Sequence, residues 1–235
     1  MSKPSIVLVH GSWADGTSWQ HVISLLIQDG YHVTAVQNPL ISLPDDIAIT
    51  KRVIDAQPGA VVAVGHSYGG AVITGAAVGN PQVKALVYIA GWALAPGDSI
   101  RQLISKYPPP PLLTAIVPDA GGFLYIDRKK FHEVFAHDVS PAEAQVLAVT
   151  QKPAASITFE QSVESAAWQT IPSWYLLAQE DRAIHPKLQQ FMASRIGAKT
   201  TELQASHVSY ISHSREVANL IIEAASSAVE SSQLV

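Results

Sequence analysis

Short apolar runs alternate with segments of helical spacing over the first part of the chain, and this alternation constrains the fold more than any other feature. The apolar runs cover residues 5–10, 32–37, 60–64 and 83–90. The segments between them place apolar side chains at helical spacing, in residues 18–30, after Pro44 and Asp45, and in residues 68–78. Because near-continuous apolar runs are typical of parallel strands buried on both faces, the pattern predicts an α/β fold with a mostly parallel sheet flanked by helices.

The alternation stops between residues 93 and 168. This stretch contains four consecutive prolines at 108–111, which fit neither a helix interior nor a central strand. Three short pieces of it look amphipathic, at residues 128–137, 141–150 and 158–168. Strand and helix patterns then return, at residues 173–178, 186–196, 200–204 and 215–229. We therefore predict one α/β core domain, residues 1–92 and 169–235, with residues 93–168 inserted as a helical cap before the strand at 173–178.

Composition excludes several classes of partner and site. The formal net charge is −4 and lysine and arginine form no run longer than three residues, so neither nucleic acid nor an anionic membrane is an expected partner. The apolar stretches are too short to span a bilayer, and the chain starts without the apolar segment of a signal peptide, so we expect a cytoplasmic protein. The absence of cysteine excludes disulfides, thiolate catalysis and Cys-ligated zinc, and we expect no metal and no cofactor. The oligomeric state is left open.

The pentapeptide Gly65-His66-Ser67-Tyr68-Gly69 lies where an apolar run meets a helical segment. A G-x-S-x-G sequence at a strand–turn–helix junction presents its serine on a sharp, strained turn at the carboxyl edge of the sheet. Glycine is needed on both sides because side chains there would collide across the bend. Ser67 is therefore the predicted nucleophile; the alternative is a serine that only caps the helix.

Two backbone N–H groups near this serine are candidates for an oxyanion hole. His10-Gly11-Ser12-Trp13 directly follows the first strand, where the loop supplies one donor in many serine hydrolases. We predict that the amides of Ser12 and Tyr68 bind the charge of a tetrahedral intermediate. Each such donor contributes about 3–4 kcal/mol to transition-state stabilisation.

The acid and the base are expected after the last two strands, in the chain order serine, acid, histidine. Glu180 and Asp181 both follow the strand at 173–178; Asp181 is preferred, although the sequence does not fix which side chain turns toward the site. His207 lies between the last strand and the last helix and is the predicted base. His66 is expected to be a packing residue. The remaining candidates are expected to begin a helix, lie too close to Asp181 or fall in the insertion: His213, His185, His132 and His137.

Together these residues resemble the α/β-hydrolase superfamily over nearly the whole chain. The small size and the single insertion resemble the plant methylesterase and hydroxynitrile-lyase group and its bacterial esterase relatives. In that group the residues after His-Gly and after the serine form the oxyanion hole, which implies Ser12 and Tyr68 here, and a helical cap covers the site. Hydroxynitrile lyases carry a lysine after the catalytic histidine and a threonine after the first histidine, whereas this chain has Val208 and Gly11.

The residues and the resemblance lead to the same functional prediction. Ser67 attacks a small carboxylic ester while His207, oriented by Asp181, accepts its proton and an acyl-enzyme forms. The alternatives are a lyase or acyltransferase that uses the same three residues, and a ligand receptor with a hydrolase fold. Several apolar residues are candidate walls of the substrate pocket, although core packing is the more common role of any one of them: Trp13, Leu94, Phe123, Tyr125, Phe131, Phe135, Trp168 and Tyr210.

Overall fold

The structure, a computed structural model, describes residues 3–231 and is built on a six-stranded sheet in which neighbouring strands run parallel. The strand order is β2-β1-β3-β4-β8-β9. The strands are β1 (Ser5–Val9), β2 (Val33–Ala35), β3 (Val61–His66), β4 (Val83–Ile89), β8 (Ser173–Ala178) and β9 (Lys199–Leu203). These six strands coincide with the six strand segments predicted from the sequence, although β9 at the sheet edge is largely polar, and the predicted α/β fold is confirmed.

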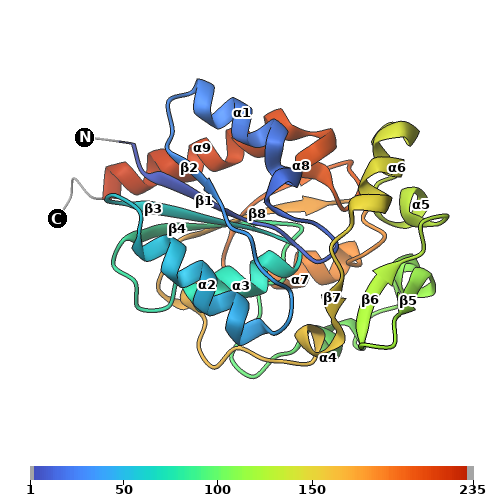
Figure 1. Ribbon diagram of the computed structural model, residues 1–235. Helices are drawn as coiled ribbons and strands as arrows, with labels where there is room; N and C mark the ends of the chain where they lie inside the picture. The colour runs from blue at the N-terminus through green and yellow to red at the C-terminus, as the bar shows by residue number, and fades with distance from the viewer. Residues whose placement is uncertain (1–2, 232–235) are drawn as a thin grey trace.

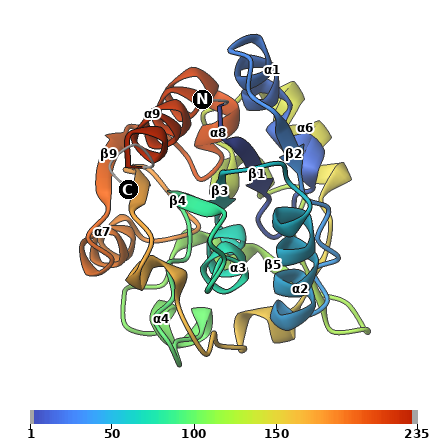
Figure 2. The same ribbon diagram turned by 90° about the vertical axis from the view of Figure 1, so that its left-hand side faces the viewer.

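Helices cover both faces of the sheet, as Figures 1 and 2 show. The helices of the core are α1 (Gln20–Gln28), α2 (Leu43–Asp55), α3 (Tyr68–Ala76), α7 (Pro186–Arg195), α8 (Ser209–Ser212) and α9 (Ser214–Ser231). Ile6 and Leu8 of β1 pack toward α1 and α9, whereas Val7 and Val9 pack toward α2 and α3, because successive side chains of a strand point to opposite faces. None of the helices within residues 3–231 combines the length and apolar character needed to cross a bilayer.

The strand order reverses at β1, which has β2 on one side and β3 on the other. In a parallel sheet, the loops that leave the two strands on either side of such a reversal diverge to opposite faces of the sheet. A crevice therefore forms at the carboxyl ends of the strands. The loop after β1 and the turn after β3 meet at this crevice. Any side chain on either segment is therefore placed where ligands of α/β proteins bind.

Residues 93–168 form short elements that gather beside the carboxyl ends of the strands, on the right of Figure 1. Their helices are α4 (Ile100–Ile104), α5 (Phe131–Phe135) and α6 (Pro141–Thr150). They also contain a three-stranded antiparallel sheet that the sequence did not predict: β5 (Ile116–Pro118), β6 (Phe123–Ile126) and β7 (Ala154–Ala155).

The helical pattern at residues 158–168 was misleading. These residues form an irregular segment that runs between two 3-10 turns, Ser156–Phe159 and Ala167–Gln169. The carbonyl oxygen of Val163 accepts a hydrogen bond from the N–H of Gly97 at 2.9 Å, so this segment is paired with the chain that follows β4. A tertiary backbone contact has thus replaced the intrahelical bonds that the pattern predicted.

Glycine allows α3 to begin directly against the end of β1. A Cβ atom on Gly69 would lie 2.3 Å from the carbonyl oxygen of Val9, and one on Gly65 would lie 2.4 Å from that of Gly69. Both distances are far below van der Waals contact with backbone atoms, so side chains would collide at these positions, as predicted. Gly75 of the same helix differs, because a Cβ there would meet the flexible end of the Ile47 side chain at 2.5 Å.

We expect Gly69→Ala to destabilise the protein, although alanine is the better helix former. The added methyl group must push two backbone segments apart, which costs on the order of 1–3 kcal/mol or more. Gly75→Ala is the matched control: the Ile47 side chain can rotate away, and the helical preference for alanine contributes up to about 1 kcal/mol. Urea unfolding measures both free energies, and equal stability of the two variants would contradict the steric argument.

Candidate active site

Ser67 occupies the turn between β3 and α3 in a backbone conformation that residues with a Cβ atom rarely adopt. Its φ is 50° and its ψ is −122°. Its N–H donates to the carbonyl oxygen of Ile89 at 3.1 Å, and its carbonyl oxygen accepts from the N–H of Trp92 at 3.0 Å. These bonds to β4 and to the chain after it hold the strained turn in place. The Ser67 side chain lines a cavity at the carboxyl edge of the sheet.

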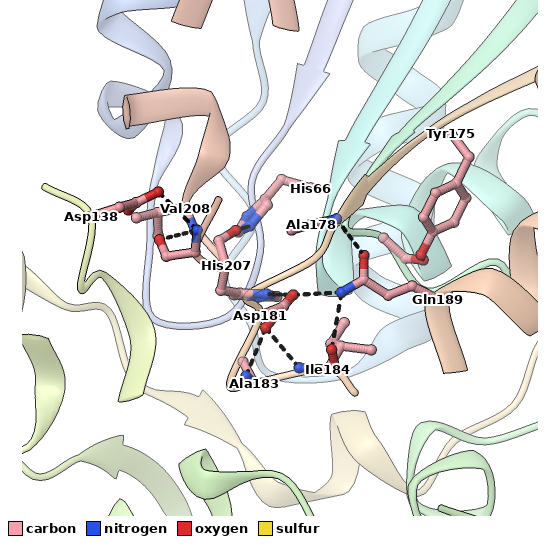
Figure 3. A network of polar contacts seen from close by, with 12 residues as sticks. His66, Asp138, Tyr175, Ala178, Asp181, Ala183, Ile184, Gln189, His207 and Val208 are labelled. Carbon is pink, nitrogen blue, oxygen red and sulfur yellow. Dashed lines mark hydrogen bonds and ion pairs between the residues drawn. The ribbon is translucent and has the colours of Figure 1, made fainter. Parts of the chain in front are cut away.

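His207 and Asp181 form a buried pair beside this turn (Figure 3). The Nδ1–H of His207 donates to Oδ2 of Asp181 at 2.7 Å. Because a carboxylate can only accept, the proton on Nδ1 leaves Nε2 of His207 as the nitrogen with a free lone pair. The other carboxylate candidate, Glu180, is exposed and pairs with His137 at 3.4 Å. The structure therefore brings Asp181, and not Glu180, to the histidine.

The carboxylate of Asp181 accepts hydrogen bonds from four donors. Its Oδ1 accepts from the backbone N–H groups of Ala183 at 2.7 Å and Ile184 at 2.9 Å. Its Oδ2 accepts from Nε2 of Gln189 at 2.7 Å, in addition to the bond from His207. With every favourable acceptor direction occupied, the carboxylate has one orientation, which in turn fixes the imidazole.

Gln189 is a site residue that the sequence analysis missed. It is completely buried on α7, and its Oε1 accepts from the N–H of Ala178 at 3.1 Å while its Nε2 also donates to the carbonyl oxygen of Ile184 at 3.0 Å. A single glutamine carries no motif. Its place beside Leu188, on the inner face of the predicted helix, is the one cue that the sequence offers.

Two further side chains hold the loop that carries His207. The Nε2–H of His66 donates to the carbonyl oxygen of His207 at 2.9 Å, and the two rings lie 4.8 Å apart. Burial lowers the pKa of His66 well below its usual range, so this ring is neutral. Asp138, from the insertion, accepts from the N–H of Ser206 at 2.8 Å. The other candidate histidines do not line the cavity: His132, His137, His185 and His213.

The loop after β1 approaches Ser67 as closely as glycine allows. A Cβ atom on Gly11 would lie 2.7 Å from Cβ of Ser67. His10 anchors the loop, because its Nδ1–H donates to the carbonyl oxygen of Gly11 at 2.9 Å and its Nε2 accepts from the N–H of Asn38 at 3.1 Å. Burial lowers the pKa of His10 to about 4, which keeps this tautomer neutral. Ser12 then lines the cavity next to Ser67.

Tyr68 is the first residue of α3, so its N–H belongs to the helix N-terminus, where the donors have no acceptor within the helix. Its side chain is buried, and its hydroxyl donates to Oδ2 of Asp46 at 2.7 Å. Oδ1 of Asp46 accepts from the N–H of Leu40 at 3.1 Å. This anchor on α2 was not predicted, and it ties the start of α3 to α2.

The cavity in front of Ser67 and His207 has a volume of about 300 Å³ and mostly apolar walls. Of the eight predicted wall residues, Trp13 lines this cavity. Arg101 also lines it and forms an ion pair with Glu160. The lining residues that the sequence did not predict come from the core edge and from the insertion: Trp92, Arg101, Ile104, Leu112, Leu113, Ile116, Leu124, Phe159, Ala183 and Ile184.

The other predicted wall residues do not line this cavity, which corrects the prediction for Leu94, Phe123, Tyr125, Phe131, Phe135, Trp168 and Tyr210. Strand geometry accounts for two of them: Leu124 of β6 faces the cavity, so its neighbours Phe123 and Tyr125 point to the opposite side. Leu94 is fully buried, and its carbonyl oxygen accepts from the Trp168 indole N–H at 2.8 Å, so both are packing residues.

Phe131, Phe135 and Tyr210 surround a second cavity, of about 240 Å³, which Trp13 also lines. Phe135 nevertheless supports the site, because its ring packs against that of His207 with centroids 4.9 Å apart. Within residues 3–231, no group of three or more histidine, aspartate and glutamate side chains is placed to hold a metal ion. The site itself combines a serine hydroxyl, an imidazole and a buried carboxylate.

Known proteins similar to this chain were found by sequence and by structure. The esterase of Nocardioides sp. that hydrolyses carbendazim is 31% identical over 51% of this chain and 53% of its own length. The pyrethroid hydrolase of Sphingobium wenxiniae is 28% identical over 98% of this chain and 90% of its own. Among solved structures, a pyrethroid hydrolase from Sphingobium faniae superposes with a TM-score of 0.82 at 23% identity, covering 97% of this chain and 100% of that one.

A methylesterase from Arabidopsis has the same fold, with a TM-score of 0.77 at 16% identity over 95% of this chain and 99% of its own. The model of the alpha/beta hydrolase family matches residues 6–220. That match runs from β1 into α9 and includes the serine turn and the segments that carry Asp181 and His207. The chain therefore belongs to the alpha/beta hydrolase family.

Proposed function

We propose that this protein hydrolyses small carboxylic esters through an acyl-enzyme formed on Ser67. One observation carries the proposal: Ser67, in its strained turn, lines the same cavity as His207, and His207 is bonded at 2.7 Å to a buried carboxylate. Relatives named as an esterase and a pyrethroid hydrolase support hydrolysis as the reaction class.

In the first half of the proposed reaction, the Ser67 hydroxyl attacks the ester carbonyl as Nε2 of His207 takes its proton. Asp181 holds the imidazole tautomer and stabilises the imidazolium that forms. The amides of Ser12 and Tyr68 bind the negative oxygen of the tetrahedral intermediate, aided by the N-terminus of α3. The intermediate collapses when His207 returns the proton to the leaving alcohol.

In the second half, a water molecule takes the place of the alcohol. His207 accepts its proton, the water attacks the acyl-enzyme, and the carboxylic acid leaves as Ser67 regains its hydrogen. The contacts of His66 and Asp138 keep the His207 loop in position through both halves. We propose that residues 93–168 act as the cap of this site, since the cavity walls from Arg101 to Phe159 belong to that stretch.

The nucleophile is tested by Ser67→Ala. We expect ester turnover to fall by about 10³–10⁶-fold with folding unchanged, because the remaining groups cannot form an acyl-enzyme. Ser209→Ala is the matched control: the hydroxyl of this buried serine has no hydrogen-bond partner among residues 3–231, so turnover should stay near the wild-type rate. The assay measures free acid and free alcohol together. A Ser67→Ala rate above a tenth of wild type would contradict the mechanism.

The two neighbouring carboxylates provide a second matched pair. Asp181→Asn should lower kcat by about 10⁴-fold, because an amide at this position favours the wrong tautomer of the histidine. Glu180→Gln should lower kcat less than about threefold, which is about the experimental scatter. Glu180 is exposed, and its carboxylate pairs with His137 rather than with His207. Steady-state kinetics on one small ester compares them, and the reverse ranking would assign the acid to Glu180.

The cavity volume predicts which esters are accepted. At about 300 Å³ the cavity is at the small end of the range for ligand pockets, so long acyl chains should be excluded by steric closure. Each added methylene gains only about 0.8 kcal/mol of attraction, which cannot offset a clash with the walls. Across p-nitrophenyl esters from acetate to palmitate, kcat/KM should peak at about four carbons or fewer. A maximum at long chains would mean that the cavity is open.

A further inference from the structure

Trp13 lies between two cavities. The cavity at Ser67, of about 300 Å³, and the second cavity, of about 240 Å³, have one lining residue in common among residues 3–231, and that residue is Trp13. The second cavity is bounded by the start of α1, by α5 and α6 and by α8. Its apolar side includes Phe131, Leu147 and Tyr210, and a polar side is formed by Asp15, Thr17, Ser18, Gln20 and Thr150. Nothing in the proposed mechanism uses it.

Three contacts hold the Trp13 indole in this position, and all three come from the insertion. The indole N–H donates to the carbonyl oxygen of Leu124 at 2.8 Å. The ring stacks on that of Phe159 with centroids 5.8 Å apart and meets Phe135 edge-on at 5.9 Å. Trp13 is only 6% exposed, so the ring is clamped between the insertion and the core.

The backbone of Trp13 is in the left-handed region, with φ at 62°. A residue with a large side chain avoids this region unless its surroundings impose it. Here the loop is fixed on one side by the close approach of Gly11 to Ser67 and on the other by the clamped indole. In this conformation the Trp13 residue lines both cavities.

We propose that Trp13 is the partition that limits the length of the acyl chain, and that the second cavity is a latent subsite for an aliphatic chain. Trp13 directly follows Ser12, so its ring stands next to the place where the carbonyl group of the ester is bound in the proposed function, on which this inference rests. A chain that extends toward Trp13 stops at the indole. Removing the indole joins the two cavities and lets the chain continue along Phe131 and Leu147.

The test compares Trp13→Ala with Trp92→Ala. Both remove the same side chain from the wall of the cavity at Ser67, but only Trp13 also lines the second cavity. We measure kcat/KM for p-nitrophenyl octanoate and butyrate. The octanoate-to-butyrate ratio should rise at least about tenfold in Trp13→Ala, the size of discrimination that apolar contacts of a few methylenes give, and clearly less in Trp92→Ala. An unchanged ratio in folded Trp13→Ala, or an equal rise in Trp92→Ala, overturns the proposal.

Trp13→Gly provides a second variant if alanine is poorly tolerated, because glycine adopts a positive φ without strain. Circular dichroism and thermal melting establish that each variant is folded. The double variant Trp13→Ala/Leu147→Trp then refills the second cavity from α6. It should return the octanoate-to-butyrate ratio to within about threefold of wild type, since the gained space is closed again. If the ratio stays high, the extra chain does not enter the second cavity and the subsite is refuted.

The proposed ester hydrolysis is tested separately from the role of Trp13. Hydrolysis of p-nitrophenyl acetate or butyrate by the wild-type protein, with loss in Ser67→Ala, supports the ester-hydrolase mechanism whatever the Trp13 variants do. If the wild-type protein releases no acid from any ester, the proposed function fails. If the wild-type protein hydrolyses esters but the octanoate-to-butyrate ratio is unchanged in Trp13→Ala, only the proposed role of Trp13 fails.

Discussion

The carboxylate of Asp181 is a buried charge, and the arrangement of the site depends on how that charge is satisfied. Leaving such a group without partners in the interior would cost far more than one hydrogen bond contributes. Four donors surround it: two amides of its own loop, Gln189 from α7 and His207 from the loop after β9. Three of these four hydrogen bonds do not involve His207, so they are independent of its protonation state. The carboxylate therefore ties β8, α7 and β9 together and presents a fixed acceptor to the imidazole.

The core could be predicted because burial on both faces of a parallel sheet leaves a strong mark on the sequence. The central strands β1, β3, β4 and β8 are mainly apolar, and helical segments follow most strands of the sheet, so these elements could be predicted before their arrangement was known. Chain order then placed the serine after β3, the acid after β8 and the histidine after β9. Asp181 was preferred to Glu180, but the sequence could not fix this choice, since neighbouring residues in a turn point in directions that no periodicity encodes.

The insertion was harder to predict, for a physical reason. Its elements are short, and contacts with other segments decide their conformation, as the bond between Val163 and Gly97 shows at the segment that resembled a helix. The pocket walls were misassigned for the same reason. Aromatic character identified Phe123 and Tyr125, but strand register turns Leu124 toward the cavity. Gln189 and Asp46 carry no motif, and only their burial reveals that they hold groups of the site.

The most direct measurement is the position at which a fluorophosphonate attaches to the protein. Such a probe phosphonylates a serine only when a base activates the hydroxyl and the oxyanion donors are in place. We predict a single adduct in the intact mass and a peptide fragment that assigns it to Ser67, with ester hydrolysis lost in proportion to the labelled fraction. An enzyme that hydrolyses esters yet stays unlabelled, or one that is inactivated by labelling at another serine, would contradict it.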